Sequence, residues 1–277
     1  MNPASEWSTY VPNYAHDKIM SSGLFDGVFY DMVMEWGKML GGIDFPDVNR
    51  ADINNDGSAD TPAVARQQYT NGMTQILKLT RELIGQEAII ICGCGAAWGE
   101  DSPYWTYANG LFQENALGTS SWSNHDFSSI WNTYQTNMQK PAPPSRINWI
   151  GADTNGTRYD DLKPSLPPAE LQKMRYGLAI TLLDDGYFHF DCSFPYHCQL
   201  WWFPEYDTNL GLALGDAQKR SDGSWMREFE NGVVVANPTS KDSTIEFQAT
   251  YRDVTTGIEG ASFVVSPLDG RIFVLTH

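Results

Sequence analysis

The chain alternates between short apolar segments and longer stretches with helical periodicity. Five apolar, β-prone segments, each followed by polar or small residues, cover 24–33, 87–95, 109–117, 146–154 and 182–191. Three stretches between them place apolar residues on one helical face, and they cover 64–85, 127–139 and 167–183. Apolar strands that alternate with amphipathic helices are typical of a parallel sheet covered by helices. The pattern therefore predicts an α/β fold.

Residues typical of helix ends mark the limits of two of the expected helices. Ile76, Leu77 and Thr80 share one stripe of the helix over 64–85, and Gly85 follows as its C-cap. Prolines open the helix over 167–183, where a missing backbone N–H costs nothing.

After about residue 225 the pattern changes to short alternating strands. Asn-Gly, Asn-Pro, Thr-Gly and Asp-Gly dipeptides separate apolar runs, as turns do in antiparallel sheets. We therefore expect two domains, an α/β part over residues 1–224 that carries the catalytic site and a small antiparallel β module over residues 225–277.

Charge narrows the range of partners. The chain has 277 residues with 18 Lys and Arg against 34 Asp and Glu, a net charge of −16. Such a surface repels a nucleic-acid backbone, and no apolar run approaches the roughly 20 residues that a bilayer requires. We expect neither a nucleic-acid nor a membrane partner, and the sequence leaves the oligomeric state open.

The first residues show no basic region followed by an apolar one, so no signal peptide is visible there. If the natural N-terminus carries a signal, we expect an extracellular or periplasmic location.

Aromatic residues add a preference for one class of ligand. The chain has 10 Trp, 13 Tyr and 13 Phe. Sugar faces stack on aromatic rings and sugar hydroxyls bond to carboxylates, so this composition suits neutral hydroxylated ligands. Alternatively, the acidic residues only keep the protein soluble and the aromatic residues only fill its core. Composition alone does not decide between ligand binding and this structural role.

Four carboxylates follow the expected strands, and they are Asp31, Glu114, Asp153 and Asp191. Catalytic side chains of parallel α/β folds gather at the carboxyl ends of strands. The chain lacks a GxSxG elbow, a P-loop and a GxGxxG motif. Paired carboxylates remain, and glycoside hydrolysis uses such a pair as acid and as nucleophile or base. The alternative role of each is to cap the following helix.

One segment has the spacing of the first half of a calcium loop, with Asp52, Asn54, Asp56 and Asp60 as its candidate ligands. The position that should hold a bidentate Glu is Ala63. Two interpretations stay open, a partial calcium clip and a metal-free loop of Asx turns. The loop of Asx turns is the preferred interpretation, so we expect no cofactor, with calcium at this loop as the alternative.

A second cluster combines His189, Cys192, His197 and Cys198. Its spacing matches no familiar zinc pattern, and Cys192 with Cys198 could instead form a disulfide in an oxidising compartment. A metal-dependent hydrolase that uses this cluster with Asp52 and Asp56 is therefore a weak alternative.

An ordered set of motifs carries a family resemblance, and it consists of FDGVFYDMV, NGLFQENAL, MRYGLAITLLDDGYFHFD, WWFPEYDTNLGLALG and REFENGVVVANPT. In this order they resemble the glycosyl-hydrolase-like families related to the endo-α-1,4-polygalactosaminidases. The resemblance implies a (β/α)8 barrel of the TIM type in which these segments supply strands 4 to 8. No counterpart of strands 1–3 precedes residue 24. We therefore expect a TIM-barrel type α/β fold with only strands 4–8 present, followed by the antiparallel β module.

The resemblance also implies roles for individual residues. Asp31, on strand 4, would be the nucleophile or base, and Glu114, on strand 6, the general acid. Asp26, at the start of strand 4, would be structural. Candidates for substrate binding near these strand ends are Trp98, Asp153, Asp191, Trp201, Trp202 and Glu205.

The sequence thus predicts a glycoside hydrolase that acts on an oligo- or polysaccharide. The alternative is a catalytically silent carbohydrate-binding remnant of such a barrel.

Overall fold

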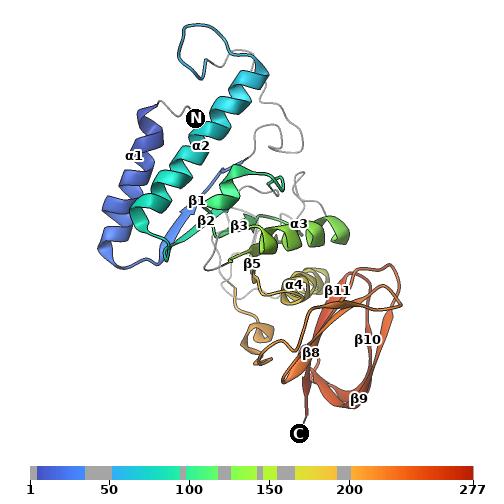
Figure 1. Cartoon of the computed structure of the whole chain (residues 1–277). Helices are drawn as coiled ribbons and strands as arrows, with labels where there is room; N and C mark the ends of the chain where they lie inside the picture. The colour runs from blue at the N-terminus through green and yellow to red at the C-terminus, as the bar shows by residue number, and fades with distance from the viewer. Residues whose placement is uncertain are drawn as a thin grey trace. The chain divides into compact units, whose positions relative to one another are not determined.

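The computed structural model describes residues 5–34, 52–93, 98–117, 126–141, 146–154, 166–191 and 201–276 (Figure 1). The chain divides into two compact units. The first unit comprises Met1–Glu114, Ser121–Ser123 and Asn132–Trp149, and the second comprises Asn115–Ser120, Asn124–Trp131 and Ile150–His277. The boundary between residues 224 and 225 expected from the sequence stays a prediction.

Five strands form a parallel sheet in the order β1-β2-β3-β4-β5. They are β1 (Gly27–Tyr30), β2 (Ile89–Gly93), β3 (Gly110–Gln113), β4 (Trp149–Asp153) and β5 (Tyr187–Asp191). Each lies inside one of the five predicted apolar segments. The predicted α/β class with a parallel sheet is confirmed, and the described strands do not include a closed barrel.

Three helices alternate with these strands as predicted, and they are α2 (Pro62–Ile84), α3 (Phe127–Gln139) and α4 (Pro168–Leu182). The Thr61 hydroxyl caps α2 by accepting a hydrogen bond from the Val64 N–H. At the other end Gly85 has a φ of 85° and donates to Arg81, which confirms it as the C-cap.

One helix, α1 (Glu6–Tyr14), was not expected from the sequence. It continues through η1 (Ala15–Ile19) and η2 (Met20–Ser22), and it ends at Gly23 with a φ of 65°. Trp7, Tyr10 and Tyr14 are all exposed on it. These three rings recur at helical spacing and form a stripe that faces solvent, whereas Val11 and Ala15 pack in the core.

The first unit places its core on one face of its strands. Val28, Ile90 and Leu111 pack in one cluster with Ile76 and Leu77 of α2. The opposite face, reached by alternate residues, carries Phe29 and Phe112. We call this second face the aromatic face.

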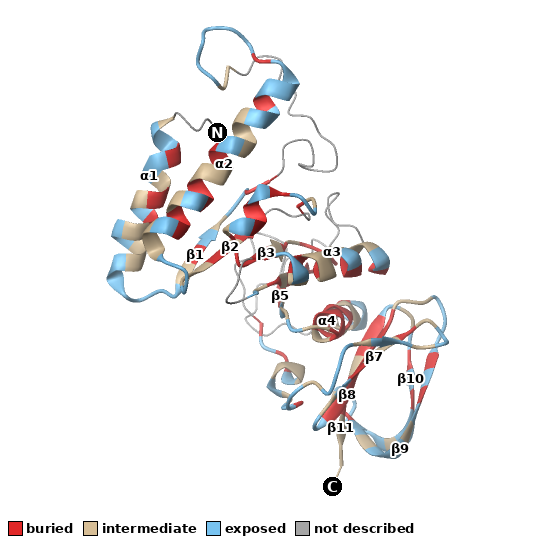
Figure 2. Ribbon diagram, viewed as in Figure 1, coloured by how far each residue is buried: buried red, intermediate tan, exposed pale blue. Residues whose placement is uncertain are grey.

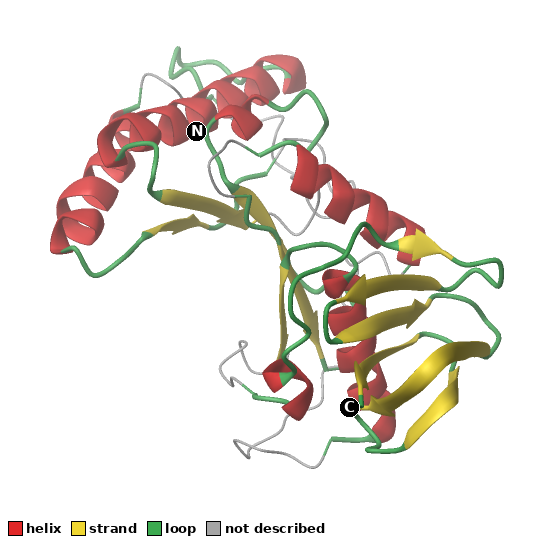
Figure 3. Cartoon of the chain, turned by 60° about the horizontal axis from the view of Figure 1, so that its bottom comes forward, coloured by secondary structure: helices red, strands yellow, loops and turns green. Residues whose placement is uncertain are grey.

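Figure 3 colours the helices red and the strands yellow along the described parts of the chain.

The antiparallel sheet of the second unit has the order β10-β9-β11-β8-β7-β6. Its strands are β6 (Gln218–Lys219), β7 (Trp225–Phe229), β8 (Gly232–Asn237), β9 (Ser243–Asp253), β10 (Glu259–Val265) and β11 (Asp269–Leu275). All residues of β8 are buried, whereas β9 is mostly exposed (Figure 2). The predicted antiparallel module is confirmed.

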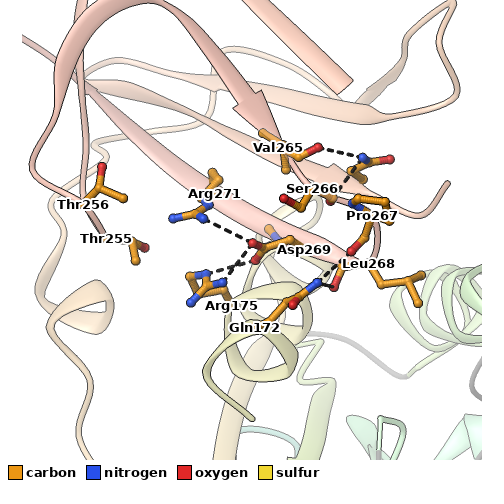
Figure 4. A network of polar contacts seen from close by, with 12 residues as sticks. Gln172, Arg175, Thr255, Thr256, Val265, Ser266, Pro267, Leu268, Asp269 and Arg271 are labelled. Carbon is orange, nitrogen blue, oxygen red and sulfur yellow. Dashed lines mark hydrogen bonds and ion pairs between the residues drawn. The ribbon is translucent and has the colours of Figure 1, made fainter. Parts of the chain in front are cut away.

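Helix α4 belongs to the same compact unit as this sheet and is joined to it by a polar network (Figure 4). Arg175 donates two hydrogen bonds of 2.9 Å to the buried Asp269 carboxylate. Gln172 adds a 2.7 Å bond to the Pro267 carbonyl. A Cβ atom at Gly270 would lie 2.3 Å from that of Ala179. The helix therefore rests directly on the β11 backbone.

This close approach corrects one detail of the predicted turns. The Asp-Gly pair at 269–270 was expected to form a turn, but it lies within β11. The chain turns before it, where Leu268 has a φ of 52°. The glycine is needed instead because α4 leaves no room for a side chain.

Candidate active site

Asp31 follows β1 and is exposed at its carboxyl end. Its Oδ1 accepts a hydrogen bond of 2.8 Å from the Met32 N–H. Met32 has a φ of 58°, a left-handed conformation that bulky residues rarely adopt and that clusters at functional sites. The turn aims the Asp31 carboxylate back over the sheet.

Gly93 of β2 provides the space for this arrangement. A Cβ atom there would lie 2.9 Å from Asp31 Oδ1 and 2.8 Å from the edge of the Phe29 ring. Both side chains therefore lie directly over the glycine, and any side chain at this position would displace them.

The segment after Asp31 is held by three side-chain donors. Tyr69 donates to the Met32 carbonyl at 3.1 Å, and Trp98 Nε1 donates to the Val33 carbonyl at 2.8 Å. Tyr104 donates to the Met34 carbonyl at 3.4 Å.

The placement of Trp98 differs from its predicted role in substrate binding. Its side chain is only 2% exposed, and its ring packs edge-on against Tyr104 and Trp105 in the core. A buried ring offers no face for a sugar. We therefore assign Trp98 to the support of the Asp31 turn and do not carry it into the proposed binding set.

Glu114 follows β3 and is half-buried. The next residue, Asn115, also has a left-handed backbone with a φ of 51°. Both candidate carboxylates thus lie one residue before a left-handed position. Because Glu114 stands two residues after Phe112, alternation along the strand directs it to the aromatic face.

An aromatic row crosses this face of the first unit. The Phe112 ring lies 6.2 Å from that of Phe29 and 4.5 Å from that of Trp149. Register pairs Tyr30 with Cys92 and Cys92 with Leu111, so Asp31 is level with Phe112. Alternation predicts that Glu114, two residues further along, leaves the same face. The first unit places both predicted catalytic residues at the carboxyl ends of β1 and β3, and their meeting on one face stays a prediction.

Asp153 and Asp191 end β4 and β5 in the second unit, and both are buried. Lys173 donates to the Asp153 carbonyl at 2.7 Å and pairs with Glu170 at 3.0 Å. His189 Nε2 lies 3.5 Å from Asp191 Oδ2. The predicted position of both carboxylates at strand ends is confirmed, and their role in binding stays a prediction.

The other predicted binding residues lie around η6 (Pro204–Asp207). Trp201 is buried and packs against Phe190, whereas Trp202 is 68% exposed. Glu205 accepts a 2.9 Å hydrogen bond from Thr255. Of the three predicted tryptophans, only Trp202 presents its ring to solvent.

Tyr206 connects η6 to the end of β5. Burial, together with the charges of Glu205 and Asp191, raises the pKa of Tyr206 well above its ordinary value. The hydroxyl therefore stays protonated near Asp191.

The predicted calcium segment is a loop whose own donors occupy its acidic side chains. Asp52 accepts from the N–H groups of Asp56 and Gly57, and Asp60 accepts from that of Ile53. The Asn54 amide nitrogen donates to both Asp56 and Asp60 at 3.0 Å.

No group of three or more His, Cys, Asp or Glu side chains that could hold a metal occurs within the described part of the chain. The two interpretations of the loop, a partial calcium clip and a metal-free loop, both stay open. Cys192, His197 and Cys198 lie outside the described residues, and Cys92 is buried in the core of the first unit.

A comparison with models of protein families shows to which family the chain belongs. The sequence model of hypothetical glycosyl hydrolase family 15 matches residues 1–233. The chain belongs to this family. The glycosyl-hydrolase-like resemblance of its motifs is thereby confirmed.

The solved structures that are similar to this chain include two glycoside hydrolases. One is the isomalto-dextranase of Arthrobacter globiformis T6 complexed with panose, at 12% identity and a TM-score of 0.46. The alignment covers 97% of this chain and 48% of that one, so the chain spans about half its length. The other is a glycoside hydrolase, with 9% identity, 76% and 62% coverage and a TM-score of 0.38. None of the curated proteins matches the chain.

The described helices include none that is long and apolar enough to cross a membrane.

Proposed function

We propose that the chain is a glycoside hydrolase of the partial TIM-barrel type in which Asp31 and Glu114 are the catalytic pair. One observation carries this proposal. The two carboxylates follow the parallel strands β1 and β3 at their carboxyl ends, and each precedes a left-handed residue. Asp31 lies over Gly93 on the aromatic face, and strand alternation directs Glu114 to the same face. Membership of a glycosyl hydrolase family supports the reaction class.

In the proposed reaction Glu114 donates its proton to the glycosidic oxygen as the bond to the leaving group breaks. Asp31 either attacks the anomeric carbon or takes a proton from the water that attacks it. In the first case water later hydrolyses the glycosyl ester and returns a proton to Glu114. The Met32 N–H holds the Asp31 carboxylate for either role.

Two variants test the assignment, Glu114→Gln and Asp31→Asn. Each keeps the side-chain shape but removes an acid or a nucleophile, so turnover should fall by about 1,000-fold or more. The control is Asp26→Asn, an exposed carboxylate just before β1, which should keep full turnover. Substrates should include neutral α-1,6- and α-1,4-glucans and α-1,4-linked galactosaminans, with products followed by chromatography.

Unchanged turnover in Glu114→Gln would overturn the assignment. The anomer first released, followed by NMR, distinguishes a retaining from an inverting pair.

A second candidate function is carbohydrate binding without cleavage. The observation that favours it is the exposure of the aromatic face, on which Phe29 is 46% exposed. Saturable binding of a glycan with no product from any substrate would support this candidate, and a single turnover product would exclude it.

A further inference from the structure

A cavity in the second unit is lined by none of the residues at the strand ends that carry the proposed catalytic pair. It has a volume of about 470 Å³ and is formed by η6, the segment after it, the turn between β7 and β8, the end of β9 and strand β11. This volume is within the range of small-ligand pockets, roughly 300–1,000 Å³.

The chemistry of the lining points to a polar, uncharged ligand. The polar residues of the lining are Asp207, Thr208, Asn209, Asn231 and Arg252, and Val254 and Val274 add apolar surface. Asp207 can only accept hydrogen bonds, Arg252 can only donate them, and the two amides do both. Opposite charges on one cavity disfavour both a strong anion and a strong cation, whereas a polyol can satisfy donors and acceptors together.

Trp202 supplies an exposed ring next to this cavity. Its Nε1 donates to Asp207 Oδ2 at 3.0 Å, and its ring packs edge-on against Tyr206 at 5.5 Å. These contacts fix the orientation of a ring that is still 68% exposed. A fixed, exposed indole beside planar polar side chains is suited to stacking on the apolar face of a sugar.

We propose that this cavity and Trp202 form a binding site for neutral oligosaccharides, separate from the proposed catalytic pair. One sugar ring occupies the cavity, where Asp207, Asn231 and Arg252 bond its hydroxyls, and the neighbouring ring stacks on Trp202. The site depends on the antiparallel module and not on Asp31 or Glu114, so binding does not require hydrolysis.

The site is tested with the whole chain carrying Glu114→Gln, so that no probe is consumed. The protein is labelled with 5-fluorotryptophan, and the Trp202 signal is assigned from Trp202→Phe. Maltotriose, isomaltotriose and cellotriose are titrated as neutral probes, with trigalacturonate as the anionic comparison. We expect at least one neutral trisaccharide to shift the Trp202 signal saturably and more strongly than trigalacturonate does.

Matched variants identify the surface that binds. Trp202→Ala and Arg252→Ala should each weaken binding, measured by calorimetry, by about tenfold. Trp7→Ala removes another exposed tryptophan, in α1, and Lys241→Ala removes an exposed cation, and both should bind as the parent does. Thermal unfolding of each variant checks that the fold is retained.

Absence of any shift at Trp202 with all three neutral probes would overturn the proposal, and so would equal binding by Arg252→Ala. Because Asp31 and Glu114 take no part, loss of this site would leave the hydrolase proposal intact, and failure of the hydrolase proposal would leave this site intact.

Discussion

The rings of Phe29 and Phe112 approach to 6.2 Å although strand β2 lies between the strands that carry them. They meet because the residue of β2 at this level is Gly93, over which the Phe29 ring and the Asp31 carboxylate both lie. A glycine in the middle strand thus brings together side chains from the two outer strands. The residues expected to perform the chemistry follow these two phenylalanines.

Gly93→Ala should therefore damage the proposed site more than the fold. The new methyl group would overlap Phe29 and Asp31 Oδ1 at less than 3 Å, and a shift of about 1 Å in a reacting group can cost roughly 100-fold in rate. We expect kcat to fall by about that factor. The control is Gly215→Ala, since a Cβ atom there meets nothing within 4 Å. Full kcat in a folded Gly93→Ala protein would show that this contact does not position Asp31.

Trp98→Phe tests the support of the Asp31 turn. The variant leaves the buried Val33 carbonyl without its 2.8 Å donor, which should cost about 1–3 kcal/mol of unfolding free energy. Trp105→Phe is a matched control, because its indole also donates to a carbonyl, that of Gly99 at 2.9 Å. Both variants should lose similar stability, but only Trp98→Phe should lower kcat. Equal kcat in the two would assign Trp98 a packing role alone.

The sequence predicted most of the fold from local patterns, and its errors have physical causes. Helix α1 was missed although Trp7, Tyr10 and Tyr14 recur at helical spacing. Its buried side carries Ser8, Pro12 and Ala15, which are small or polar residues and give no apolar pattern. Gly270 was interpreted as a turn because its packing partner, α4, is almost 100 residues earlier in the chain.

In the candidate site too, the features visible in the local sequence were predicted, and those that depend on packing between distant segments were not. Spacing and family resemblance located Asp31 and Glu114 at strand ends, since a carboxylate after an apolar run is visible locally. The sequence did not show which of the tryptophans expose their rings to solvent. Trp98 is in the core and Trp202 is in solvent, and only the packed structure distinguishes them. Gly93 was not singled out either, because its role arises from side chains on two other strands.

Asp269→Asn should destabilise the second unit strongly. Asp269 is buried and accepts two 2.9 Å bonds from Arg175, with Arg271 at 3.3 Å. Removing one partner from a buried pair costs about 3–5 kcal/mol, because the remaining charges stay buried. Urea unfolding followed by the fluorescence of the tryptophans should show this loss. Lys78→Ala, which breaks the exposed pair with Glu82, should change the same free energy by less than about 0.5 kcal/mol.

Calcium should not stabilise the loop of residues 52–60. The Asn54 amide nitrogen donates to both Asp56 and Asp60, and backbone N–H groups occupy Asp52. The loop therefore satisfies its carboxylates without a cation. We expect the melting temperature to be the same in a chelator and in about 5 mM calcium, above the dissociation constants of weak extracellular calcium sites. A rise with calcium that Asp52→Asn abolishes would establish the alternative, a partial calcium clip.

Asp222 should make the antiparallel sheet sensitive to acid. Burial alone would raise its pKa, but hydrogen bonds from Ser224 and Ser243, together with the charge of Arg220, lower the pKa to about 2. An unfolded aspartate titrates near about 3.9. A folded pKa below the unfolded one means that the carboxylate stabilises the fold above about pH 4, and that this contribution is lost as the pH falls toward 2.

Asp222→Asn removes this dependence. The difference in melting temperature between the parent and Asp222→Asn should be largest above pH 4 and should shrink steadily as the pH falls toward 2. Asp216→Asn, an exposed residue of the same region, should show no such trend. If the difference in melting temperature stayed constant across this range, the substitution would destabilise the protein through the shape of the Asn side chain and not through the lost charge. Only the contribution of the charge changes with proton binding.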